Sequence, residues 1–115
     1  MNRGDVVRIQ LPRPRGTPGH EQFGMRPAII VQDEPSLANL STVLIVPMTS
    51  NRAATRFTGS ILVSPSKSNG LTMPSVALTQ QLRAVDKTRI DCTLGSVSSD
   101  VLEAIDDALR QMLKI

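Results

Sequence analysis

The last part of the chain, SSDVLEAIDDALRQMLKI at residues 98–115, is its only long stretch with helical periodicity. Its apolar residues recur at the spacing of one helix face, and its charged residues fall on the opposite side. Ser98 or Ser99 can cap this helix, and Asp100 and Lys114 carry charges that suit its two ends. This stretch decides the fold, because such a helix must bury its apolar face on a second layer of structure.

The rest of the sequence predicts the other layer, a set of short β-strands. Runs rich in β-branched and other apolar residues occupy positions 5–11, 27–32, 42–48, 59–64, 75–80 and 88–95. The segments between them contain Pro, Gly, Asn or Ser and are expected to be loops, at 12–25, 33–41, 51–57 and 65–74. The predicted class is therefore α+β, with a small curved antiparallel β-sheet or partly open barrel and a C-terminal amphipathic helix.

Composition narrows the class of protein. A chain of 115 residues with 40% hydrophobic content is expected to form one domain over residues 1–115. Thirteen Lys and Arg against ten Asp and Glu give a net charge of +3, which permits a phosphate-bearing partner without demanding one. The lone Cys92, the lack of a signal-like start and the lack of any span-length apolar run favour a cytoplasmic protein away from membranes. No metal-ligand spacing is present, so neither a metal nor a cofactor is expected.

The segment GHEQFGMRPAII at residues 19–30 concentrates polar and backbone-permissive residues directly before an apolar run. Pro27 biases Arg26 toward an extended conformation, so the guanidinium can be held at a strand edge as a phosphate clamp. Thr49 follows another apolar run and can donate its hydroxyl to a phosphate oxygen. Glu21 can orient Arg26 or act as a base, and His20 can exchange protons near neutral pH.

Several motifs together resemble the MazF/PemK family of toxin endoribonucleases over nearly the whole chain. They are RGDVV at 3–7, GHEQFGMRPAIIV at 19–31, VPMTS at 46–50, GL at 70–71, QQLRAVDKTRI at 80–90 and IDDALRQML at 105–113. The resemblance implies an SH3-like barrel of the CcdB/PemK type. It also implies the toxin component of a type II toxin–antitoxin system that inhibits translation and growth.

The activity that the resemblance implies is metal-independent, sequence-specific cleavage of single-stranded RNA, including mRNA. The 2′-hydroxyl attacks the adjacent phosphate and leaves a 2′,3′-cyclic phosphate and a 5′-hydroxyl. The implied partners are a second copy of the chain in a homodimer and a cognate antitoxin with an acidic or disordered C-terminal segment. The alternatives are a CcdB-like toxin that binds gyrase, or a family member without catalysis.

The resemblance marks Arg26 and Thr49 as catalytic, with Glu21 and His20 in roles that stay open. Where some relatives carry an Arg and an Asp assigned as acid and base, this chain has Leu78 and Gln80, so that scheme is not carried over. Residues around the same segments are expected to contact RNA, namely Gln22, Phe23, Ser50, Arg52, Arg56, Gln81 and Arg83.

Structural roles compete with each of these assignments. Arg26 can pair with Asp33 or Glu34, and Thr49 can cap the segment that follows it. Arg83, Asp86 and Arg89 can form a charge network. Phe23 can pack under its loop or face a base, Phe57 is expected in the core or in a lid, and packing roles are expected for Cys92, Met48, Met73 and Met112.

Overall fold

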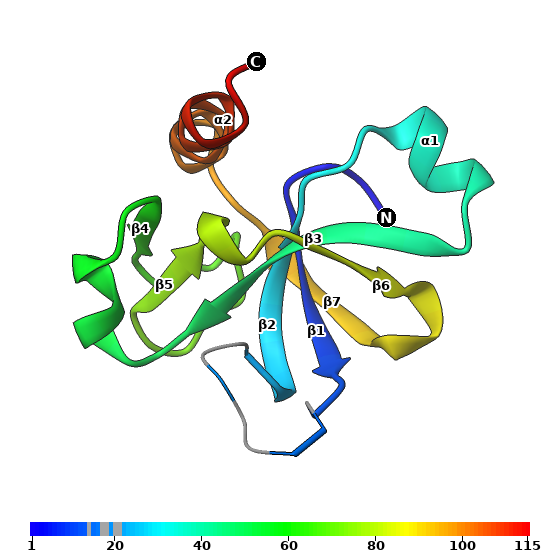
Figure 1. Cartoon of the computed structure of the whole chain (residues 1–115), viewed down its shortest axis with the longest axis horizontal. Helices are drawn as coiled ribbons and strands as arrows, with labels where there is room; N and C mark the ends of the chain where they lie inside the picture. Colours follow the sequence, from blue (N-terminus) through cyan, green and yellow to red (C-terminus); the bar gives the residue numbers. More distant parts are fainter. Residues whose placement is uncertain (14, 17–18, 20–21) are drawn as a thin grey trace.

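The computed structural model describes residues 1–13, 15–16, 19 and 22–115. In this part of the chain, seven strands form one antiparallel sheet (Figure 1). The strands are β1 (Asp5–Leu11), β2 (Gly24–Ile30), β3 (Thr42–Thr49), β4 (Ser60–Val63), β5 (Ser75–Leu78), β6 (Arg83–Asp86) and β7 (Ile90–Ser96). The helices are α1 (Glu34–Asn39) and α2 (Ser99–Leu113), with short 3-10 helices η1 (Arg52–Arg56), η2 (Thr79–Gln81) and η3 (Lys87–Arg89). The predicted α+β fold with a curved antiparallel sheet and a C-terminal helix is confirmed.

Strand β3 is the centre of the sheet. The strand order is β4-β5-β3-β2-β1-β7, and β6 also pairs with β3. Residues 42–45 of β3 pair with β6, residues 45–47 pair with β2, and residues 48–49 pair with β5. Figure 1 shows β3 crossing the molecule between these partners. The end of β3 therefore lies where the sheet divides toward β2 on one side and β5 on the other.

Both faces of the sheet are covered, and each face has its own hydrophobic cluster. Neighbours along a strand point to opposite faces, so Val7 belongs to the cluster around Ile9 and Ile45, whereas Val6 belongs to the cluster around Met48 and Ile105. All of these side chains are fully buried. Burial on both faces explains why the strand segments are nearly continuous apolar runs instead of alternating ones.

Helix α2 closes the second cluster, as its period predicts. The Ser98 side chain caps it by accepting a hydrogen bond from the Val101 amide, which settles the choice between the two serines. Ile105 is the fully buried residue of the helix, and Val101 and Leu109 pack beside it. Lys114 adopts the left-handed conformation just after the last turn and ends the helix.

Two predicted loops contain short helices. The segment 33–41, predicted as a loop, contains α1, and the segment 51–57 contains η1. Helix α1 has six residues, with Asp33 as its cap, Pro35 in its first turn and Leu37 as its buried residue. Six residues are too few to show a helical period, so the caps were the only signals in the sequence.

Strand boundaries also differ from the sequence prediction. Strand β2 begins at Gly24 instead of Pro27, and it ends at Ile30. The predicted strands at 75–80 and 88–95 are shortened because η2 and η3 occupy Thr79–Gln81 and Lys87–Arg89. Strand β6 was missed, because its four residues RAVD contain a single buried apolar side chain. Among the described residues, no helix is long and apolar enough to cross a membrane.

Candidate active site

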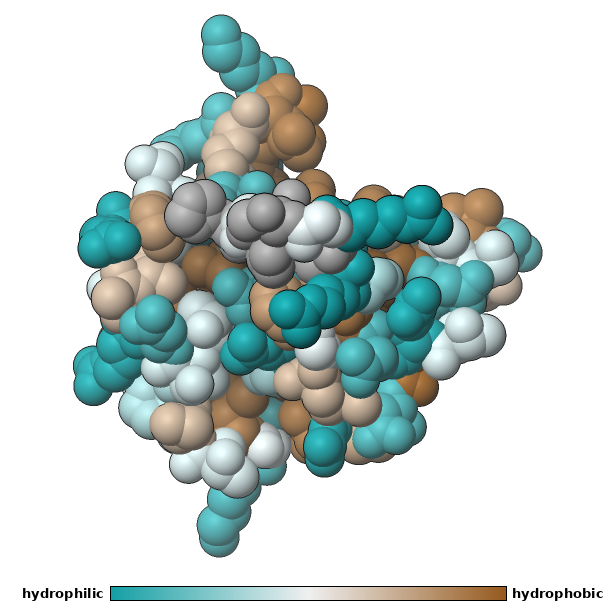
Figure 2. Space-filling model, turned by 60° about the horizontal axis from the view of Figure 1, so that its bottom comes forward, coloured by the Kyte–Doolittle hydropathy of each residue, from teal (hydrophilic) through white to brown (hydrophobic). Residues whose placement is uncertain are grey.

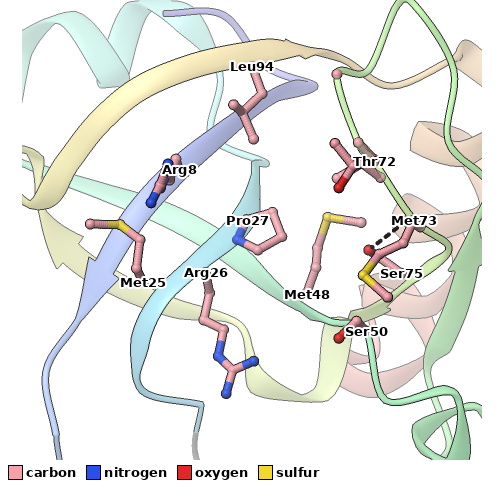
Figure 3. A pocket seen from close by; sticks show the side chains of 12 residues that line it. Arg8, Met25, Arg26, Pro27, Met48, Ser50, Thr72, Met73, Ser75 and Leu94 are labelled. Carbon is pink, nitrogen blue, oxygen red and sulfur yellow. Dashed lines mark hydrogen bonds between the residues drawn. The ribbon is translucent and has the colours of Figure 1, made fainter.

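Arg26 lies near the start of β2, opposite Ile9 of β1. It is half-buried, and its Nε donates a hydrogen bond to the Phe23 carbonyl oxygen at 3.1 Å. In the described part of the chain, no acceptor lies within hydrogen-bond distance of its terminal nitrogens, and Figure 3 shows the guanidinium at the edge of a cavity. The local bond fixes the side chain while leaving its fork open to an anion.

The expected alternative partners of Arg26 are engaged elsewhere. Asp33 accepts hydrogen bonds from Ser36, which lower the pKa of its carboxyl, and Glu34 accepts one from the Arg3 amide. No ion pair joins Arg26 to either acid among the residues that the structure describes. The surface-pair interpretation of Arg26 is therefore wrong.

Thr49 ends β3 and is 7% exposed. Its Oγ1 accepts a hydrogen bond from the Asn51 amide at 3.2 Å, so the hydroxyl proton remains to be donated. The side chain of Asn51, and not that of Thr49, caps η1 by accepting from the Ala53 amide. Thr49 therefore holds the turn before η1 rather than the 3-10 helix itself.

The strand register relates Arg26 to Thr49. Strands β2 and β3 pair Ala28 with Pro47, and the same register continued by two residues would place Arg26 opposite Thr49. Hydrogen-bonded pairing stops before that point, because the end of β3 pairs with β5 instead. The two residues thus lie at the same end of adjacent strands, on either side of a division in the sheet.

A cavity of about 370 Å³, here called the methionine cavity, lies on the Arg26 side of this division. Met25, Met48 and Met73 contribute to its lining (Figure 3). The complete lining is Arg8, Met25, Arg26, Pro27, Met48, Ser50, Gly70, Leu71, Thr72, Met73, Ser75 and Leu94. Of the residues predicted to contact substrate, it includes Arg26 and Ser50.

Another cavity, of about 230 Å³ and here called the η1 cavity, lies on the Thr49 side. It brings together four of the predicted site residues with parts of η1 and β5. Its lining is Gln22, Thr49, Asn51, Ala53, Ala54, Arg56, Phe57, Leu78 and Gln81. Arg52 is exposed on η1 and lines neither cavity. The predicted site residues are therefore divided between the methionine cavity and the η1 cavity.

Hydrogen bonds tie the end of the β1–β2 connection to the segment around β6. The backbone amide of Gln22 donates to Gln81 Oε1 at 3.0 Å, and Arg83 Nη1 donates to the backbone carbonyl oxygen of Gln22 at 3.1 Å. Gln22 Oε1 is buried and has no hydrogen-bond partner among the residues that the structure describes. Gln22, Gln81 and Arg83 therefore form one cluster, which the sequence separated by about sixty positions.

The predicted network of Arg83, Asp86 and Arg89 is only partly present. Asp86 accepts hydrogen bonds from the amide and hydroxyl of Thr88, which lower the pKa of its carboxyl, with a smaller contribution from the charge of Arg89. Arg83 instead contacts Gln22, and no ion pair links it to Asp86 in the described chain. The network interpretation is wrong for Arg83.

Each of the two phenylalanine rings has an arginine guanidinium over its face. Phe23 is half-buried, belongs to none of the hydrophobic clusters of the described residues, and has Arg13 Cζ 5.1 Å from its ring centroid. Phe57 is 45% exposed, with Arg56 Cζ 5.0 Å from its ring centroid. The core interpretation of Phe57 is wrong because of this exposure, and the residue lines the η1 cavity.

Other expectations have mixed outcomes. Met48 is fully buried as predicted, Met112 is 37% exposed, Met73 is 52% exposed and Cys92 is exposed. Leu78 is buried and cannot exchange protons, and Gln80 is exposed. His20 and Glu21 lie outside the described residues. Within the described ranges, no group of three or more His, Cys, Asp or Glu is placed to hold a metal ion.

The sheet, the C-terminal helix and the polar strand ends match a known class of small bacterial toxins. The chain belongs to the family described as PemK-like, MazF-like toxins of type II toxin–antitoxin systems, whose model matches residues 2–113. It is similar to endoribonuclease MazF9 of Mycobacterium tuberculosis, with 28% identity over 120 residues that cover 100% of this chain and 98% of the relative.

Solved structures support the same fold. A crystal structure of MazF from Deinococcus radiodurans superposes with a TM-score of 0.80 at 23% identity, covering 100% of this chain and 97% of the other. An endoribonuclease from a mycobacterial species, solved in complex with its cognate antitoxin, superposes with a TM-score of 0.76 at 23% identity over 100% of this chain and 96% of the other.

Proposed function

We propose that this chain is the toxin of a type II toxin–antitoxin pair. We also propose that it cleaves single-stranded RNA at the sheet edge where β2 begins and β3 ends. The observation that carries the proposal is the state of Arg26, whose Nε is fixed by the Phe23 carbonyl while its terminal nitrogens have no acceptor among the described residues. Membership of the toxin family and the similarity to a named endoribonuclease support it.

The proposed chemistry is an internal transfer at phosphorus. The 2′-oxygen loses its proton and bonds to the adjacent phosphorus, and the bond from phosphorus to the 5′-oxygen then breaks as that oxygen gains a proton. Arg26 neutralises the extra charge on the phosphate oxygens, and the Thr49 hydroxyl donates to one of them. Glu21, His20 or water supplies the proton transfers.

The surface around this site suits a partner with both charged and apolar groups. Seen from the side of the β1–β2 connection, hydrophilic and hydrophobic side chains are interspersed (Figure 2). The residues proposed to contact the RNA are Gln22, Phe23, Ser50, Arg52, Arg56, Gln81 and Arg83. Phosphate contacts from the arginines would position the strand, and contacts to bases would select the sequence.

The deciding experiment is cleavage of a long single-stranded RNA in the presence of EDTA. Wild-type protein should cut at defined positions and leave 2′,3′-cyclic phosphate ends. Arg26→Ala should lower the cleavage rate by about a hundredfold or more, since it removes a donor to the developing charge, and Arg26→Lys should restore only part of it. Intact RNA alongside trapped gyrase complexes would favour the gyrase-binding alternative.

The proposal includes a cognate antitoxin and a twofold homodimer. Large apolar side chains are exposed on β4 and at the end of α2, including Leu62, Leu113 and Ile115. Exposed apolar surface of this kind is commonly covered by a self-complementary contact. Sedimentation at micromolar concentration should therefore give a dimer, and a monomer with full RNase activity would contradict this part of the proposal.

A further inference from the structure

The methionine cavity has apolar lining residues that the predicted catalytic residues do not explain. Pro27 and Met48 face each other across it, and Met73 lies on the opposite side from Met25 (Figure 3). Met48 is fully buried, whereas Met25 and Met73 are 41% and 52% exposed. The cavity thus has a fixed floor and adjustable rims, because methionine side chains are flexible and polarizable.

One wall of the cavity is rigid before any ligand binds. The side chain of Asn69 is 5% exposed and bonds to the backbone of Ser64, Ser66 and Leu71. Gly70 has φ of +69°, and a Cβ at this position would overlap the carbonyl oxygen of Leu94. The loop that carries Thr72 and Met73 is therefore locked against β7, and the cavity is preorganised.

The cavity lining also has polar and positively charged members, and Arg8 Nε lies 4.0 Å from Asp91 Oδ2. Arg8 and Arg26 both line it, and the side chains of Ser50 and Thr72 add hydroxyl groups. The Ser75 hydroxyl is already used, because it donates to the Met73 carbonyl oxygen at 3.2 Å. Cations beside apolar lining residues suit a ligand with an apolar body and an adjoining phosphate.

We propose that the methionine cavity receives the base next to the phosphate held by Arg26, and that Met73 is a specificity-determining residue of the RNA cleavage. This inference rests on the proposed function. The chain has no Trp or Tyr and only two Phe, so few aromatic rings are available for bases to stack on. Thioether groups supply a substitute, since sulfur contacts aromatic rings favourably.

A nucleotide fits the cavity better than an apolar anchor from a protein. The volume of about 370 Å³ is in the range of small-molecule sites and exceeds what one aliphatic side chain fills. The hydroxyl groups of Ser50 and Thr72 can bond to the edge of a base, whereas an aliphatic anchor would leave them unused. An antitoxin side chain in this cavity is therefore the competing outcome of the test.

The test uses an RNA with a single cleavage site and a 2′-deoxy nucleotide at the cut, so that it binds without being cleaved. A second RNA is abasic at the nucleotide next to the scissile phosphate. Binding of both is measured for wild type, for Met73→Ala and for a matched control, Leu40→Ala, which removes an apolar side chain that is 49% exposed after α1. Thr72→Val provides a second cavity variant of similar volume.

Met73→Ala should weaken binding of the intact RNA by about three- to tenfold and leave binding of the abasic RNA unchanged. Leu40→Ala should change neither, and Thr72→Val should alter which base is preferred at that position. The proposed base pocket would be refuted if Met73→Ala weakened binding of both RNAs equally. It would also be refuted if Met73→Ala weakened antitoxin binding and left RNA binding unchanged. Wild-type cleavage of the all-ribose RNA is measured in parallel, because its absence would refute the proposed function itself.

Discussion

Phe23 had two alternative roles, packing under its loop or facing a base, and the structure favours the second. The ring is half-buried outside the hydrophobic clusters of the described chain, and its carbonyl oxygen holds Arg26. Because the backbone supplies that bond, Phe23→Ala should keep it. We expect Phe23→Ala to weaken RNA binding by about 1–3 kcal/mol, as for loss of a stacked base, with the melting temperature nearly unchanged.

The measurements for Phe23→Ala are an RNA titration and a thermal melt, with Phe23→Leu as the control for volume. A core phenylalanine would instead lose about 3–5 kcal/mol of folding stability on truncation. A large drop in melting temperature would therefore refute the stacking role. The pair also separates loss of an aromatic ring from loss of apolar bulk.

At the same scale, the sequence indicates the candidate residues Arg26 and Thr49 but not the methionine cavity. Arg26 and Thr49 stand in local motifs beside strand ends, so their neighbourhood was visible in the sequence. Met25, Met48 and Met73 come from separate segments and meet only through the strand register and the locked loop. Methionine has no motif of its own, so nothing local could indicate the cavity.

Among the elements, α2 gives the clearest prediction for stability. Ile105 is fully buried against the cluster that contains Val46 and Met48. Ile105→Ala should lower the free energy of unfolding by about 2–5 kcal/mol, through lost burial and a residual cavity. Glu103→Ala is the control on an exposed position of the same helix. Urea unfolding that gives equal values for the two variants would contradict this account of α2.

The turn between β6 and β7 should respond to acid. Hydrogen bonds from Thr88 hold the pKa of the Asp86 carboxyl below its ordinary 3.8. Ionised Asp86 therefore stabilises the fold above pH 3.8, and the contribution is lost as the pH falls through the folded pKa. Asp86→Asn should be less stable than wild type at neutral pH, and the difference should shrink in acid.

Urea unfolding between neutral pH and about pH 3 measures this difference for Asp86→Asn. Thr88→Val removes the hydroxyl donor but keeps the amide donor, so it should lose less stability than Asp86→Asn. A difference between wild type and Asp86→Asn that grows toward low pH would show that the carboxylate does not stabilise this turn.

Long elements with a periodic apolar pattern were predictable from the sequence, and short elements defined by their caps were not. Strand β1 was predicted nearly to the residue because it buries several side chains, and α2 because its fifteen residues repeat an apolar face, with Ile105 fully buried and Val101 and Leu109 partly buried beside it. Helix α1 and β6 each bury one apolar side chain, so tertiary contacts and capping define them. Helix α1 connects β2 to β3, and β6 lies between β5 and β7 in the chain and pairs with β3.

For the whole molecule, net charge and the two cavities decide how an inhibitor would act. The chain carries +3, and Arg8, Arg26 and Arg56 line the cavities on either side of the end of β3. An extended antitoxin segment with carboxylates and apolar anchors can occupy this surface and would become ordered as it binds. The proposed function places RNA phosphates on the same arginines, so binding of the two should be mutually exclusive.

Competition can be measured with a fluorescent, non-cleavable RNA and a synthetic peptide of the antitoxin's C-terminal segment. The peptide should displace the RNA, and both affinities should fall as salt rises, because each rests on charge pairing with the same cations. Arg26→Ala should weaken both ligands, whereas Arg110→Ala, on the exposed side of α2, should weaken neither. Simultaneous binding of peptide and RNA without mutual effect would mean that the antitoxin inhibits from another surface, and the shared-cation account would fail.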